Sequence, residues 1–106
     1  MVLVSAISAW EIALLADAGR INLDVPAVVW FERFLDRVGI ESIPLTVRSA
    51  ATAYSWPNLD HRDPADRLLM STAIELKCPL VTYDTRIVRF AETFGRAYGL
   101  EVATAA

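Results

Sequence analysis

The chain has 106 residues, of which 55% are hydrophobic and 22% charged, a composition typical of one globular domain and not of a disordered segment. The net charge of −3 argues against a surface that grips nucleic acid throughout, but it permits a local basic rim or a group of acids that holds a cation. Residues 1–7 carry no basic flank and are soon followed by Glu11, so we expect neither a signal peptide nor a membrane span. Cys78 is the single cysteine and cannot close a disulfide within the chain, which favours a cytoplasmic location.

The N-terminal segment is predicted to be a strand followed by a helix. Residues 2–7 are rich in Val, Leu and Ile and predict a buried strand. The run Ser8-Ala9-Trp10-Glu11 has the spacing of a capping box, which would begin a helix that runs to Gly19.

The next elements are a second helix, a second strand and a short third helix. Pro26 would open the second helix and Gly39 would close it. Helical spacing predicts that its inward face consists of Val28, Phe31, Phe34, Leu35 and Val38. Residues 40–45 predict a strand whose proline suggests a sheet edge, and residues 46–55 predict a short helix capped by its first residue.

A polar loop over residues 58–62 leads into a central helix that ends near Lys77. Asp63 is a suitable N-cap, Pro64 suits the first helical position, and Asp66 falls in the first turn, where the helix dipole favours an anion. A narrow polar stripe follows at every fourth residue, namely Arg67, Ser71 and Glu75. Most other positions are apolar and predict a largely buried helix, namely Ala65, Leu68, Leu69, Met70, Ala73, Ile74 and Leu76.

The C-terminal part is predicted to hold a strand over residues 79–83 that ends at Asp84, a helix over 85–94 and a last strand over 100–104. Strands that alternate with helices indicate a mostly parallel sheet flanked by helices on both faces. We therefore expect one three-layer α/β domain over residues 1–106.

Four acids are expected at one edge of this sheet. Glu11 would begin the first helix, Asp63 and Asp66 begin the central helix, and Asp84 ends the third strand. Helix N-termini and the carboxyl ends of parallel strands share one edge, where open α/β folds bind ligands. Clustered carboxylates repel one another unless a divalent cation neutralises them, and Mg²⁺ or Mn²⁺ prefers such oxygen ligands. Each acid could instead serve as a helix cap or a partner of a helix dipole, so both interpretations stay open.

Three motifs together resemble the PIN-domain ribonucleases, and in particular the VapC-type toxins of toxin–antitoxin pairs. The motifs occupy residues 2–13, 63–69 and 79–84. The resemblance implies a metal-dependent endoribonuclease in which Glu11, Asp66 and Asp84 match the catalytic, metal-binding acids and Asp63 matches an additional metal ligand. It also implies Mg²⁺ or Mn²⁺ as cofactor, an RNA substrate, a homodimer, and inhibition by an antitoxin of the VapB type.

The sequence departs from the family pattern at its N-terminus. PIN domains open with a strand that ends in a metal-binding Asp, followed by one or two helices, and this opening has no counterpart before Met1. We therefore expect an N-terminally truncated PIN-like fold that binds metal weakly. An alternative function is an inactive PIN-like module that binds an antitoxin or itself and cleaves no RNA. A receiver-type acidic pocket is a third interpretation, but Lys77 lies at the wrong end of the central helix for it.

Basic and aromatic side chains admit two interpretations each. Arg62, Arg67 and Arg86 flank the acids and could bind RNA phosphates, or they could be solvated. His61 is expected in an exposed linker. The three tryptophans are expected to be core residues or dimer anchors, namely Trp10, Trp30 and Trp56.

Overall fold

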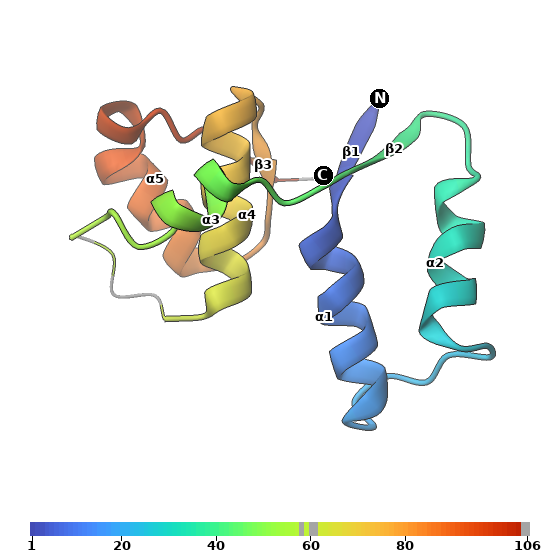
Figure 1. Ribbon diagram of the computed structural model, residues 1–106. Coiled ribbons are helices and arrows are strands. Elements are labelled where there is room, and N and C mark those ends of the chain that lie inside the picture. The colour runs from blue at the N-terminus through green and yellow to red at the C-terminus, as the bar shows by residue number, and fades with distance from the viewer. Residues whose placement is uncertain (58, 60–61, 105–106) are drawn as a thin grey trace. The chain divides into compact units, whose positions relative to one another are not determined.

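The computed structural model describes residues 1–57, 59 and 62–104, and the chain forms two compact units, Met1–Leu45 and Thr46–Ala106 (Figure 1). Each unit combines helices with one pair of parallel strands. The predicted α/β class with parallel strands is confirmed. The organisation of residues 1–106 as one domain stays a prediction.

The first unit contains two strands and two helices, namely β1 (Val2–Ser5), α1 (Ala6–Asp17), α2 (Ala27–Leu35) and β2 (Ile40–Ile43). β1 and β2 pair in parallel, with Val2 opposite Ile40 and Ser5 opposite Ile43. A parallel pair needs a long crossover, which α1 and α2 supply as two helices packed side by side (Figure 1).

The start of α1 differs from the predicted capping box. Ser5, and not Ser8, is the N-cap, and its hydroxyl accepts a hydrogen bond from the Ile7 N–H at 3.1 Å. Strand pairing decides between the two serines, because β1 follows β2 only as far as Ser5 and the chain is then free to turn into a helix. Glu11 consequently lies in the second turn of α1 and cannot be a capping-box acid. Gly19 lies just beyond the Ala18 C-cap with φ of +73°, as its predicted role requires.

The inward face of α2 is shorter than predicted. Phe31 is buried and its ring packs against those of Trp30 and Phe34, with centroids 5.5 and 5.7 Å away. Val28, however, is 64% exposed and Val38 is fully exposed, so both were wrongly assigned to the interior. Val38 follows the end of the helix, where helical spacing no longer applies, and a unit of this size has too little mass to cover a whole helix face.

The second unit contains three helices and two short strands, namely α3 (Val47–Thr52), α4 (Pro64–Leu76), β3 (Leu80–Val81), α5 (Thr85–Tyr98) and β4 (Val102–Ala103). α3 packs on α4, α4 contacts β3, and β3 pairs in parallel with β4. Both strands are shorter than the predicted ranges 79–83 and 100–104. α5 runs past the predicted end at residue 94 and stops at Gly99, which has φ of +76°.

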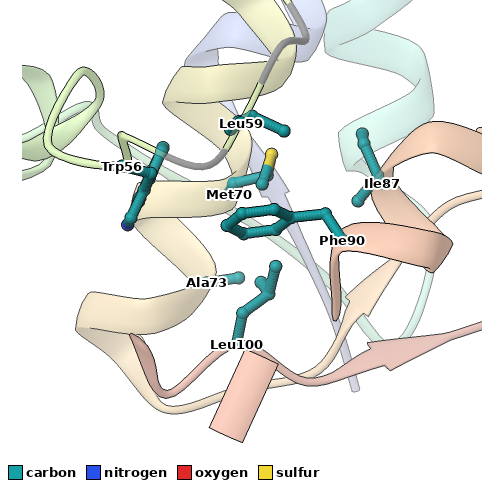
Figure 2. Packing of buried hydrophobic residues seen from close by; sticks show 7 residues of the cluster. All are labelled: Trp56, Leu59, Met70, Ala73, Ile87, Phe90 and Leu100. Carbon is teal, nitrogen blue, oxygen red and sulfur yellow. The ribbon is translucent and has the colours of Figure 1, made fainter. Parts of the chain in front are cut away.

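One hydrophobic cluster holds the second unit together (Figure 2). Its buried members come from α4, α5 and the loops around them, namely Trp56, Leu59, Met70, Ala73, Ile87, Phe90 and Leu100. Trp56 is thus a core residue, as expected, whereas Trp10 in the first unit is 52% exposed. Leu100 belongs to this core and not to a strand, and its carbonyl approaches Gly95 so closely that an added Cβ there would lie 2.6 Å from it.

The polar stripe of α4 faces protein and not solvent. Ser71 is buried and its hydroxyl donates to the Ser49 carbonyl at 2.6 Å. The Glu75 carboxylate accepts hydrogen bonds from the Thr46 hydroxyl at 2.6 Å and from the Ser49 hydroxyl. These hydrogen bonds lower the pKa of Glu75, and the bond from Ser49 has the larger effect. Ser71 and Glu75 of this stripe therefore link α4 to the α3 segment by hydrogen bonds. Within the described part of the chain, no helix is both long and apolar enough to cross a membrane.

Candidate functional site

Two of the predicted acids lie together at the start of α4. Asp63 is exposed and Asp66 is half-buried, and a carboxylate oxygen of one lies within 4.8 Å of a carboxylate oxygen of the other. Residues three apart share a face of the first helical turn, which brings the two side chains together. The helix dipole at this end of α4 stabilises negative charge.

Asp63 also acts as the N-cap that its sequence context predicts. Its Oδ1 accepts a hydrogen bond from the Ala65 N–H at 2.9 Å, and Pro64 occupies the first helical turn. A cap of this kind uses one carboxylate oxygen for the helix, and the carboxylate has a second oxygen. The capping role and a ligand role are therefore compatible for this residue.

Asp84 is the N-cap of α5. Its Oδ1 accepts from the backbone N–H groups of Arg86 at 2.9 Å and Ile87 at 3.4 Å, and its Oδ2 lies 3.6 Å from the Arg86 guanidinium. It follows the end of β3 at Val81 by three residues, close to the strand end that was predicted for it. In Figure 1 the first turns of α4 and α5 lie at the same end of the second unit, so Asp84 and the pair at α4 belong to one end of it.

Glu11 belongs to the first unit. It lies in the second turn of α1 and is half-buried. The structure therefore gives Glu11 no helix-capping role, which removes the simplest alternative to a ligand role for this residue.

Arg67 differs from its predicted place on a polar, solvated face. Only 7% of the residue is exposed, and its guanidinium donates to the carbonyls of Ala53 at 3.1 Å and Leu59 at 3.0 Å. The guanidinium also lies over the ring of Tyr54, 4.6 Å from the ring centroid. These contacts tie the guanidinium to the segment before α4, so the expectation that Arg67 is solvated was wrong, while its contact with RNA stays a prediction.

The other candidate RNA contacts remain accessible. Arg62 is exposed just before α4, and the Arg86 side chain is 68% exposed at the start of α5. His61 lies outside the described residues. Tyr54 was not singled out from the sequence, although it is 64% exposed and its ring contacts the Arg67 guanidinium. Its position in a turn after a short helix offered no periodicity that could have indicated a role.

Comparisons with known proteins identify the family of the chain. Residues 1–93 match the family described as PIN domain. Over 84 residues the chain is 42% identical to Ribonuclease VapC22 of Mycobacterium tuberculosis (strain ATCC 25618 / H37Rv). That match covers 79% of this chain and 63% of the relative, so the chain spans less than two thirds of the relative's length. No solved structure gives a significant match. The chain is similar to a ribonuclease of the VapC type, and it belongs to the PIN-domain family.

Proposed function

We propose that this protein is a metal-dependent endoribonuclease of the VapC type. The observation that carries the proposal is the carboxylate pair of Asp63 and Asp66 at the N-terminus of α4. Membership of the PIN-domain family and likeness to a relative named as a ribonuclease support the same function.

The acids fit a divalent cation of the Mg²⁺ or Mn²⁺ kind. All are carboxylates, which are the hard oxygen donors that these ions prefer, and the pair at α4 is close enough for both to reach one ion. In the proposal, Glu11 and Asp84 complete the ligand set. That arrangement requires residues 1–106 to act as one PIN-like domain, which is part of the proposal.

The proposed reaction is the addition of water across a phosphodiester bond of RNA. When bound, a divalent cation would neutralise charge at the scissile phosphate and favour deprotonation of a water, whose oxygen bonds to phosphorus while the bond to the leaving ribose oxygen breaks and that oxygen takes up a proton. Asp63, Asp66, Asp84 and Glu11 would hold and orient that cation. The exposed guanidinium of Arg86 is suited to a backbone phosphate, and Arg62 offers a second cation on the loop before α4.

Partners belong to the proposal as well. A protein of this type would form a homodimer in the cytoplasm and would be inhibited by an antitoxin of the VapB type. An antitoxin that covers the start of α4 would block both the acids and the approach of RNA.

The test is cleavage of a mixed single-stranded RNA pool by the purified chain with Mn²⁺, and again with EDTA. Asp66→Asn removes one ligand charge and keeps the side chain's size. Glu92→Gln is the matched control, because this acid lies exposed on α5, two turns beyond Asp84. Calorimetric titration with Mn²⁺ measures the affinity for the cation independently of cleavage.

We expect cleavage that EDTA abolishes, a loss of at least about a hundredfold in Asp66→Asn, and no change in Glu92→Gln. Weaker Mn²⁺ binding by Asp66→Asn should accompany the loss. Cleavage that persists in EDTA would contradict the metal-dependent mechanism. Tight Mn²⁺ binding without cleavage would instead favour the alternative, an inactive PIN-like module that binds an antitoxin or a second copy.

A further inference from the structure

Tyr54 is an aromatic residue that is held in place and yet largely open to solvent. The Arg67 guanidinium lies over its ring at 4.6 Å from the centroid, while 64% of Tyr54 remains exposed. The same guanidinium donates to Ala53 on one side of Tyr54 and to Leu59 further along the loop. The ring is therefore backed by a buried cation that is itself fixed to the backbone.

Packing within the fold leaves most of Tyr54 uncovered. The guanidinium donates to the carbonyls of Ala53 and Leu59, and its contact with the Tyr54 ring comes in addition to these two hydrogen bonds. The exposed part of the ring contributes little to the hydrophobic core, whose members lie elsewhere in the second unit. An ordered ring with an open face loses little conformational entropy when a flat ligand stacks on it.

The position of the ring links it to the candidate site. Arg67 directly follows Asp66 on α4 and lies one turn after Asp63. The residue that backs Tyr54 is therefore part of the same first turns that carry the carboxylate pair. In the proposal, a strand whose phosphate reaches a cation held by those carboxylates passes the helix start on which Arg67 stands, and one of its bases can stack on the ring that Arg67 backs.

We propose that Tyr54 is a stacking platform for one nucleobase of a single-stranded RNA substrate. The inference rests on the proposed ribonuclease function and adds to it the form of the substrate: a strand with an accessible, unpaired base next to the scissile phosphate. Aromatic side chains bind single strands by stacking in this way with little sequence preference, because every base offers a flat face.

The test measures binding and cleavage separately. Binding of a fluorescent single-stranded RNA is followed by anisotropy in the Asp66→Asn background with Mn²⁺, so that the strand stays intact. Tyr54→Ala removes the ring, Tyr54→Phe keeps it, and Tyr54→Leu keeps an apolar cover without a flat face. Val47→Ala is the control, since this exposed side chain lies on α3 of the same unit. A second RNA of the same length carries abasic sites, which keep the phosphates and remove the bases.

We expect Tyr54→Ala and Tyr54→Leu to weaken binding of the normal strand by at least about fivefold, and Tyr54→Phe and Val47→Ala to leave it within about twofold. All variants should bind the abasic strand alike. In the cleaving parent background, the ring-removing changes should raise KM more than they lower kcat.

Four results would overturn the proposal. One is equal binding of the normal strand by all variants, and a second is no binding of RNA by any of them. Another is a loss in Tyr54→Phe as large as that in Tyr54→Ala. The fourth is a defect that persists with the abasic strand, which would show that the ring only supports the loop. Base-dependent binding without Mn²⁺-dependent cleavage would support stacking of a base on Tyr54 and contradict the proposed ribonuclease function.

Discussion

Replacing Arg67 by Met tests whether the hydrogen bonds of this buried guanidinium stabilise the segment before α4. Methionine fills the space of the aliphatic stem but has no hydrogen-bond donor. The carbonyls of Ala53 and Leu59 would lose their guanidinium partner, at a cost of about 1–3 kcal/mol each when no water replaces it. Loss of the contact with Tyr54 adds about 0.5–1 kcal/mol.

One effect works in the opposite direction. Arg67 is only 7% exposed, so its guanidinium has lost most of its hydration in the folded state, and the methionine avoids that cost. We therefore expect Arg67→Met to lower the free energy of unfolding by about 2–4 kcal/mol, a large part of the roughly 5–15 kcal/mol typical of a whole domain.

Urea denaturation followed by far-UV circular dichroism measures this loss as a lower midpoint at unchanged slope. Arg89→Met is the matched control, because it makes the same chemical change on the exposed side of α5 and should alter stability by less than about 0.5 kcal/mol. Equal stability of Arg67→Met and Arg89→Met would refute the reasoning. It would mean that water satisfies both carbonyls or that desolvation of the guanidinium cancels its hydrogen bonds.

Two further predictions concern the second unit. The pKa of Glu75 is lowered from its usual 4.5 by two hydroxyls of the α3 segment, so its ionised form stabilises the fold above about pH 4.5. That contribution is lost as the pH falls through the lowered pKa, and Glu75→Gln should remove this part of the acid dependence in urea midpoints measured from pH 6 to 3; an unchanged profile would contradict it. Gly95→Ala should destabilise the protein by about 1–3 kcal/mol despite alanine's higher helix propensity, because the new Cβ would meet the Leu100 carbonyl at 2.6 Å. A thermal midpoint equal to or above that of the parent would show that the loop after α5 can move aside.

Much of the local structure could be predicted from short patterns. Asp63 followed by Pro64 marks the start of α4, and Thr46 caps α3, because capping depends on a side chain and the two or three N–H groups next to it. The α/β class with parallel strands and the family resemblance also follow from the order of apolar runs and acidic motifs. The placement of all four acids at a single site stays a prediction, since it requires residues 1–106 to act as one domain.

Tertiary structure alone decided between choices that are locally equivalent. Ser5 and Ser8 are similar capping residues, and the register of β1 against β2 selects Ser5 by ending the strand there. Helical spacing put Arg67 on a polar stripe, which on an isolated helix would face water. The carbonyls of Ala53 and Leu59 belong to a segment whose position cannot be predicted from the sequence pattern of α4. Their hydrogen bonds to the guanidinium make Arg67 a buried residue that links this segment to the helix. A periodic pattern identifies the residues that share a face, but the burial of that face depends on the segment that packs against it.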